Sequence, residues 1–308
     1  MWTEQQNFAI VQTELDSVFY QEFNYDDNNP LMTTCKNGMV FKQMTIDRAA
    51  YIEEIYKGIN LFSVTGETQT VAASVPKVAN KLTSYVKDYT NSVELSKDLF
   101  DDNQHGVWSR TVQEFALKAR ITQDDNAFAL FRNGFTTTLT ADGQPLFSAS
   151  HPLIGGGTLS NLISGALSPS TINDAIIALG QQKDQAGVIL GQQPAVLLVP
   201  LALIKKAIEY TDSALAADTA NNNINVYRAA YGYRVFASPY LGAAAGGSDT
   251  AWFMLGRQHG IKRIVRQGIE TALRPWQMSN NRTYLYQANF REVVVAVDYV
   301  GAVGSTGL

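Results

Sequence analysis

The longest helical pattern in this 308-residue chain runs from about Gln104 to Phe131 and constrains the fold more than any other feature. One apolar group in it recurs at i, i+4, i+7 and i+11, and a second gathers near its end. The two groups are Trp108, Val112, Phe115 and Ala119, then Ala127, Phe128, Leu130 and Phe131. A helix of this length spans ~42 Å, so we expect it to be the backbone of the fold. Asp124 and Asp125 lie in its polar middle, which predicts a solvated or intersubunit face.

The chain before this helix begins with an acidic arm. Residues 1–57 hold nine Asp or Glu against four Lys or Arg, and residues 24–30 have the composition of a loop. Apolar residues at helical spacing predict a short helix from Ile46 to Lys57. These residues are Ile52, Ile55, Tyr56 and Ile59.

Residues 61–97 form an excursion that is rich in Thr, Ser, Val and Tyr. Its second half, from Thr83 to Val93, alternates as a strand does. A two-stranded excursion with so few core residues is not stable alone. We therefore expect a neighbouring subunit to cover it.

A separate α/β unit is predicted from residue 163 to residue 256. Ser170 or Thr171 can cap a helix there, which Gly187 ends. The run "PAVLLVP" at 194–200 predicts a buried strand. The other predicted elements are a helix at 201–210, strands at 231–237 and 251–255, and a flexible Gly/Ala-rich tip between those two strands.

The last 50 residues are strand-like and basic, with "GIKRIV" and "REVVVAVDYV" as the clearest strands. Seven Lys or Arg stand against two Glu between residues 257 and 292. Such a face suits either DNA or the acidic arm of the next subunit. Arg263 and Arg266 are the candidates for the second kind of contact.

The stretch "DGQPLFSASHPL" at 142–153 most resembles an active site, because Ser148 and His151 are three residues apart. The Gly-x-Ser-x-Gly turn of a hydrolase is absent, so a turn followed by an extended connector is the preferred interpretation. The glycine triplet at 155–157 lacks the spacing of a phosphate loop and predicts a flexible linker. The three histidines are far apart in the sequence, so we expect neither a metal site nor a cofactor.

Composition excludes several classes of protein. A net charge of −4 argues against a dedicated nucleic-acid-binding protein. One cysteine, Cys35, cannot form an internal disulfide, and we expect a partly buried thiol. No apolar run approaches the ~20 residues that a bilayer requires, so no membrane association is predicted.

Three stretches carry a resemblance to a known family: "TADGQPLFSASHPLIGGG", "YGYRVFASPYLGAAAGGSDTAWFMLG" and "GIETALRPWQMSNNRTYLYQANFREVVVAVDY". In this order and spacing they resemble the major capsid proteins of tailed phages with the Hong Kong 97-like fold. Within that family the chain is most similar to the group that includes the phage Mu major head subunit. The resemblance covers nearly the whole chain.

The resemblance implies an α+β fold in four parts. These are an N-terminal arm with a short helix (1–60), an extended β loop (61–97), a peripheral domain with a long spine helix (98–162 and 257–308) and an axial domain (163–256). The extended loop would lie over a neighbouring subunit, and axial domains would meet at the centres of pentamers and hexamers, with 211–225 and 241–249 as candidate tips. The candidate intersubunit residues are Lys77, Lys81, Tyr85, Lys87, Arg263, Arg266 and Asp249.

The implied function is that of a structural protein without catalysis. Copies of the chain would assemble, in the host cytoplasm, into the icosahedral shell of a virion around double-stranded DNA that they contact non-specifically. A scaffolding protein, a portal and a decoration protein are possible partners. No helical scaffolding segment is evident at the N-terminus, so a separate scaffold or none is expected, and no lysine is marked as a covalent crosslink.

Two alternatives stay open at this point. An encapsulin-like compartment would use the same fold to enclose cargo enzymes. A soluble α/β hydrolase would use Ser148 and His151 and would need a pocket beside His151.

Overall fold

The computed structural model describes residues 4–24, 38–59, 61–62, 64, 77–98, 105–213, 231–275 and 282–308. Cys35 and nearly all of the predicted loop at 24–30 lie outside these residues, as does most of the candidate tip at 211–225. No helix among the described residues is long and apolar enough to cross a membrane.

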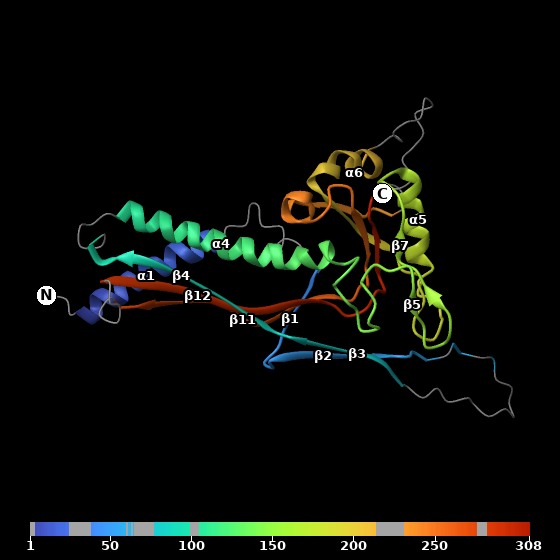
Figure 1. Ribbon diagram of the computed structural model, residues 1–308, viewed down its shortest axis with the longest axis horizontal. Coiled ribbons are helices and arrows are strands. Elements are labelled where there is room, and N and C mark those ends of the chain that lie inside the picture. The colour runs from blue at the N-terminus through green and yellow to red at the C-terminus, as the bar shows by residue number, and fades with distance from the viewer. Residues whose placement is uncertain are drawn as a thin grey trace.

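One long helix, α4 (His105–Arg132), lies along a four-stranded sheet and reaches a second, upright unit at its far end (Figure 1). The helix predicted at about 104–131 is therefore confirmed. We call the four-stranded sheet the peripheral sheet. Its strand order is β1 (Lys42–Thr45), β11 (Ile261–Arg274), β12 (Thr283–Ala296) and β4 (Lys87–Ser96).

The two apolar groups of α4 are buried in different cores. Trp108, Val112 and Phe115 pack over the peripheral sheet. Phe128 and Phe131 belong to a second core, which includes residues of the upright unit. One helix thus joins both halves of the molecule.

A helix that the sequence analysis did not predict, α1 (Glu4–Phe23), packs against the first half of α4. Leu15, Phe19 and Phe23 face the core, and the ring of Phe19 lies 5.8 Å from that of Phe115. Asp16 accepts hydrogen bonds from the hydroxyls of Thr271 and Tyr286 at 2.7 and 2.8 Å. The predicted arm is therefore in part a helix that is docked onto its own chain.

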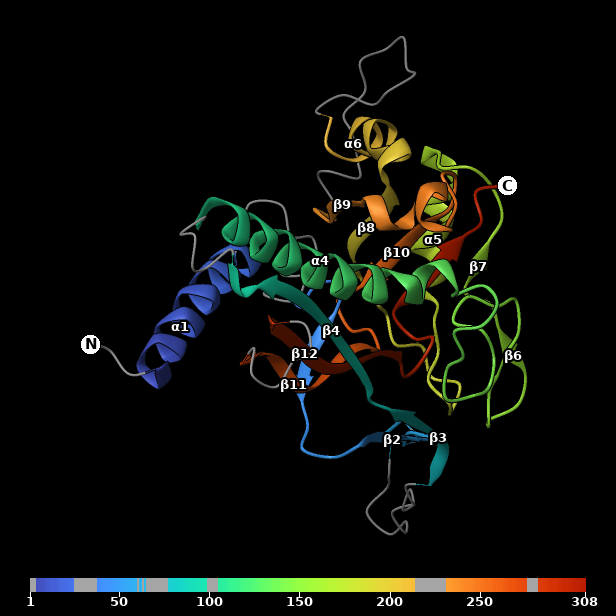
Figure 2. The same cartoon turned by 60° about the vertical axis from the view of Figure 1, so that its left-hand side comes forward.

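The upright unit contains a five-stranded sheet, which we call the axial sheet (Figure 2). The helices α5 (Pro169–Gly180) and α6 (Ile204–Thr211) pack against it, and a short 3-10 turn, η1 (Leu201–Leu203), precedes α6. The strand order is β7 (Leu162–Ile163), β13 (Ala302–Ser305), β10 (Trp252–Gly256), β8 (Pro194–Pro200) and β9 (Arg234–Ser238). Strand β13 comes from the end of the region that the sequence analysis assigned to the peripheral domain, yet it pairs with β10 and β7.

The limits of α5 differ from the prediction. Ser168, rather than Ser170 or Thr171, caps the helix, because its hydroxyl accepts the Thr171 N–H at 3.2 Å. Pro169 then occupies the first turn, where a missing N–H costs nothing. The helix ends at Gly180, well before Gly187.

The Gly/Ala-rich segment 241–249 is not a flexible tip. It forms two 3-10 turns, η2 (Pro239–Leu241) and η3 (Ala243–Ala245), beside the end of α4. The Arg132 guanidinium donates to the Tyr240 carbonyl at 2.7 Å. A side chain at Gly247 would lie 2.1 Å from the Leu241 carbonyl oxygen, so glycine is needed there for close packing.

The predicted helix at 46–57 is wrong, because strand β2 (Ala50–Tyr56) occupies it. Strand β2 pairs with β3 (Val78–Tyr85) in an antiparallel hairpin that projects past the peripheral sheet (Figure 1). We call this pair the projecting hairpin. The other half of the predicted excursion, β4, pairs with β12 of its own chain along ten residues.

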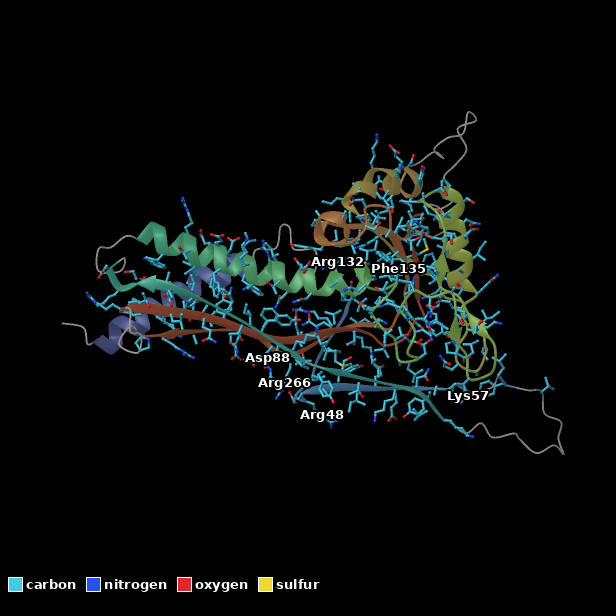
Figure 3. All side chains as sticks on the ribbon, viewed as in Figure 1. Arg48, Lys57, Asp88, Arg132, Phe135 and Arg266 are labelled. Carbon is cyan, nitrogen blue, oxygen red and sulfur yellow. The ribbon has the colours of Figure 1, made fainter. Side chains whose placement is uncertain are left out.

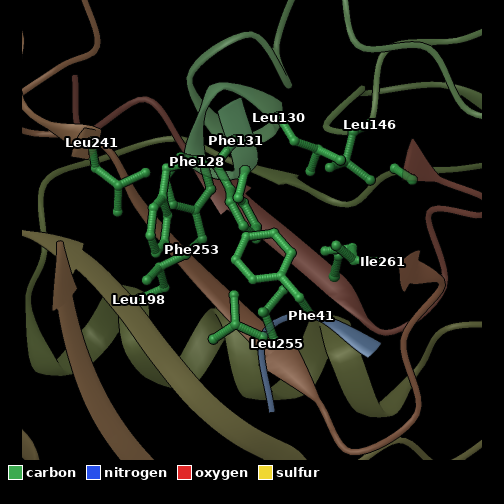
Figure 4. Close-up of a cluster of buried hydrophobic side chains, with 14 of the residues drawn as sticks. Phe41, Phe128, Leu130, Phe131, Leu146, Leu198, Leu241, Phe253, Leu255 and Ile261 are labelled. Atoms are coloured by element: carbon green, nitrogen blue, oxygen red, sulfur yellow. The ribbon is translucent and has the colours of Figure 1, made fainter. Parts of the chain in front are cut away.

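Phenylalanine rings pack together within the aliphatic core at the junction (Figure 4). The Phe41 ring lies 5.5 Å from that of Phe128 and 5.8 Å from that of Phe131, and Phe131 contacts Phe253 of β10 at 5.3 Å. All four side chains are at most 2% exposed. The junction of the two units is therefore a closed part of the hydrophobic core.

Replacing Phe131 with alanine should lower the free energy of unfolding by about 3–5 kcal/mol, because a full aromatic side chain leaves a closed core. Urea unfolding of the unassembled chain would measure this loss. Phe62→Ala is the matched control, since the Phe62 side chain is fully exposed. Equal stability of the two variants would contradict the junction packing.

Candidate self-association surface

The projecting hairpin has one face that its own chain does not cover. On that face Ile52 stands opposite Thr83, Glu54 opposite Lys81, and Tyr56 opposite Val78. Ile52, Tyr56 and Val78 are each at least half exposed, and Tyr85 is 73% exposed. The face is thus apolar around one pair of opposite charges.

The opposite face of the hairpin is anchored. Tyr51 is buried and packs with Ile264, Val295 and Val297 of the peripheral sheet region, and Ile55 and Leu82 pack against that cluster. Covered and exposed side chains alternate along both strands, because the side chains of neighbouring residues in a strand point to opposite faces. The hairpin therefore has an inner face fixed to its own subunit and a free outer face.

An ion pair strengthens this anchor. The Lys262 ammonium lies 2.7 Å from the Glu53 carboxylate and 3.0 Å from the Tyr51 hydroxyl. Burial alone would lower the pKa of Lys262, but the Glu53 carboxylate and the Tyr51 hydroxyl outweigh burial and raise it. Lys262 therefore stays charged and holds the root of the hairpin to β11.

Beyond the paired strands, the hairpin carries more exposed apolar side chains. Leu61 is 74% exposed, and Phe62 and Val64 are fully exposed. Lys57, which follows β2, lies beyond the peripheral sheet in Figure 3. An apolar surface at the end of a long projection is typical of a contact with another molecule.

The structure does not bring the seven predicted intersubunit residues into one patch. Lys81 and Tyr85 are on the outer side of the hairpin, Lys77 precedes β3, and Lys87 begins β4 opposite Glu292. Asp249 lies in the upright unit, which we also call the axial unit, where its carboxylate accepts the Ala243 N–H at 2.9 Å.

The two predicted arginines differ in their surroundings. Arg266 is half-buried on β11 and, like Arg48, lies on the side of the peripheral sheet away from α4 (Figure 3). Arg263 is only 5% exposed, and its Nε donates to Glu292 at 2.8 Å. This corrects the prediction that Arg263 lies on an open basic face, because its charge is neutralised inside its own sheet.

The buried carboxylate of Glu292 is compensated by the charge of Arg263. It is 2% exposed, and its second carboxylate oxygen, Oε1, has no hydrogen-bond partner. Burial raises the pKa of Glu292, and the Arg263 charge only partly opposes that effect. Removal of Arg263 would leave an uncompensated carboxylate in the interior.

The two acidic residues in the polar middle of α4 differ in exposure. Asp124 is 2% exposed, which corrects the prediction of a solvated or intersubunit face at that residue. Asp125 pairs with Arg132 at 2.6 Å, but its side chain is 45% exposed, so the prediction stays a prediction there.

Ser148 and His151 do not form a nucleophile and base. The His151 side chain is fully buried, and its ring nitrogens contact Asp142 and Asn161 rather than Ser148. The Ser148 hydroxyl accepts the Ser150 N–H at 3.2 Å. A substrate could not reach this histidine, so the preferred prediction of a structural connector accounts for these contacts.

The glycine triplet is a turn rather than a flexible linker. It joins the two short strands β5 (His151–Pro152) and β6 (Thr158–Leu159), and the Leu153 N–H donates to the Gly157 carbonyl at 3.1 Å. Gly156 and Gly157 have φ angles of 97° and 87°, which favour glycine.

Comparison with known proteins gives a family match. The sequence profile of a family described as phage capsid protein matches residues 80–305. The major capsid protein of Escherichia phage Mu is 33% identical over 67 residues, which cover 22% of this chain and 22% of that protein. The matched segment is thus about a fifth of the Mu protein.

Solved structures share the fold at low sequence identity. The procapsid of bacteriophage JBD30 matches with a TM-score of 0.55 and 14% identity, covering 99% of this chain and 76% of that chain. A virus-like particle from Pyrococcus furiosus also gives 0.55, at 8% identity and 95% and 98% coverage. The capsid of the native GTA particle gives 0.53, at 13% identity and 88% and 89% coverage. The predicted Hong Kong 97-like α+β fold is confirmed.

Arg263→Met should destabilise the folded chain by about 3 kcal/mol or more near neutral pH, because Glu292 would remain buried and charged. Protonation of Glu292 neutralises this charge, so the deficit should shrink as the pH falls. Urea unfolding at several pH values measures both effects. The double variant Arg263→Met/Glu292→Leu is the control and should recover most of the stability. A deficit independent of pH would contradict the assignment.

Proposed function

Because this chain belongs to the phage capsid protein family, we propose that it is the major capsid protein of a tailed phage and that its copies form the shell of the virion. In this proposal the subunits gather into pentamers and hexamers of an icosahedral shell around double-stranded DNA. The family is one of structural proteins, so the chain contributes contacts rather than catalysis.

The projecting hairpin is the observation that best supports this proposal. Its inner face is fixed to its own subunit by Tyr51 and Lys262, whereas its outer face and its end expose apolar side chains. A two-stranded ribbon gains little stability by itself. A neighbouring copy that covers the outer face would bury Ile52, Tyr56 and Tyr85 and stabilise the hairpin by association.

The charge of the chain fits a shell around DNA. The net charge of −4 would let packaged DNA slide instead of adhering, because phosphate groups are not strongly attracted to such a surface. A separate scaffold, a portal and a decoration protein are the further partners that we propose, with assembly in the host cytoplasm.

An encapsulin-like compartment is the second candidate. The fold alone does not favour either function, because an encapsulin-like compartment would be built from the same fold. The family match over residues 80–305 favours the viral shell. Extraction of shells purified from cells separates the two, because one encloses nucleic acid and the other protein cargo.

Ile52→Asp should prevent or strongly weaken shell formation without unfolding the subunit, because it places a charge on the outer face of the hairpin. Negative-stain electron microscopy and gel filtration would report assembly, and thermal unfolding would report the fold. Ile189→Asp is the matched control, because Ile189 has a similar exposure of 59% in a loop of the axial unit. If the Ile52 variant assembled like the natural chain, the hairpin would not be the contact.

The lysines of the hairpin region should not form covalent crosslinks. Shells boiled in denaturant should therefore dissolve into chains of single length on an electrophoresis gel. A ladder of oligomers would contradict this prediction and would direct attention to Lys77, Lys81 and Lys87.

A further inference from the structure

Two buried histidines have opposite hydrogen-bonding arrangements. His259 accepts the Ile261 N–H at Nδ1, at 3.3 Å, and donates from Nε2 to the Met39 carbonyl at 3.0 Å. One nitrogen must be bare and one protonated, which is the neutral form. Burial and the nearby Lys42 charge lower the pKa of His259 to about 4, in agreement with this assignment.

His151 faces two acceptors. Its Nδ1 lies 2.7 Å from the Asp142 carboxylate, and its Nε2 lies 3.1 Å from the side-chain oxygen of Asn161. The orientation of Asn161 follows from its other contacts. Its amide nitrogen donates to the carbonyls of Leu146 and Ala302, at 2.7 and 3.1 Å, and its oxygen accepts the Ser148 N–H at 2.9 Å. The oxygen of Asn161 therefore points at His151.

The Asp142 carboxylate is also an acceptor. Burial alone would raise the pKa of Asp142, but hydrogen bonds from His151, the Thr140 hydroxyl and the Gln144 N–H outweigh burial and lower it. A carboxylate on one side and an amide oxygen on the other require a hydrogen on each ring nitrogen. The neutral ring would leave one of these contacts without a proton.

The remaining groups around His151 come from other parts of the chain. The ring of Tyr299 stacks on the imidazole at 4.1 Å, a geometry that favours a cation. Asp298 precedes Tyr299 in the sequence. The negative charges of Asp298 and of Asp184, in the loop after α5, both add to the effect of burial in raising the pKa of Tyr299. Burial raises the pKa of Asp298 to about 6, the nearby Asp142 charge adds to this rise, and backbone hydrogen bonds and the His151 charge oppose it.

We infer that His151 is held as an imidazolium cation whose two hydrogen bonds lock the connector to both units of the fold. Asp142 follows α4, His151 and Asn161 belong to the connector, and Ala302 begins β13 of the axial sheet. The cation thus joins the turn after α4 to the connector, and Asn161 carries the contact on to the distant strand β13.

Two carboxylates near His151 respond to pH. Because burial raises the pKa of Asp298 to about 6, its ionisation destabilises the folded chain as the pH rises from about 4 to about 6, and this loss is complete above that range. Below the lowered pKa of Asp142, acid would remove the carboxylate and release the lock.

Nitrogen NMR of the full chain labelled with ¹⁵N-histidine tests the charge directly, in whichever state of assembly the protein is purified. Two signals of protonated nitrogens are expected for His151 at pH 6, and one protonated plus one bare nitrogen for His259. His151→Gln and His259→Gln assign the signals. A bare nitrogen on His151 at pH 6 would overturn the inference, whether or not shells form.

Amide hydrogen exchange tests the consequence for the junction. His151→Gln should lower the protection factors of residues 146–163 roughly tenfold or more, the size expected for the loss of one charge-assisted hydrogen bond. His259→Gln, at the other buried histidine, should leave the protection of these residues unchanged. Unchanged protection in the His151 variant would contradict the lock.

Discussion

The fold depends on the burial of α4 in two different cores. A helix gains most of its stability from the packing of its apolar face rather than from its own propensity. Here Phe115 packs with α1 and the peripheral sheet, whereas Phe131 packs with β10 of the axial sheet. The two units therefore share one rigid axis, and neither retains a complete core without it. This continuity gives a large subunit a fixed shape that it can repeat in every copy.

The projecting hairpin, in contrast to α4, leaves much of its apolar surface uncovered by its own subunit. Its inner side chains and the Lys262–Glu53 ion pair are enough to set its direction, but its outer side chains gain nothing from the subunit. Such a surface is costly for a protein that remains alone and useful for one that associates. The division between a buried root and an exposed end is therefore consistent with a chain whose final stability comes from many copies.

The sequence predicted the elements whose apolar pattern is long and continuous. Helix α4, strand β8 and the long strands β11 and β12 belong to this group, and the family resemblance placed them in the correct fold. Strand β2 was mistaken for a helix because Ile52, Ile55 and Tyr56 fit helical spacing, while its pairing with β3 is a tertiary contact. Arg263 and Glu292 are 29 residues apart and meet only when β11 pairs with β12, so their mutual burial could not be inferred locally. The two acceptors of His151 likewise become visible only in three dimensions, although Asp142 and His151 were both within the stretch first suspected of chemistry.

The position of β13 has a consequence for how the chain folds during synthesis. In the axial sheet it lies between β7 and β10, yet it is translated after every other strand of both sheets. Domains often fold as they leave the ribosome. The axial sheet, however, lacks the strand between β7 and β10 until residues 302–305 have been synthesised. By then the strands of the peripheral sheet have all been made. The two units therefore close together, and a nascent chain does not present a finished axial unit to other copies before its peripheral half exists.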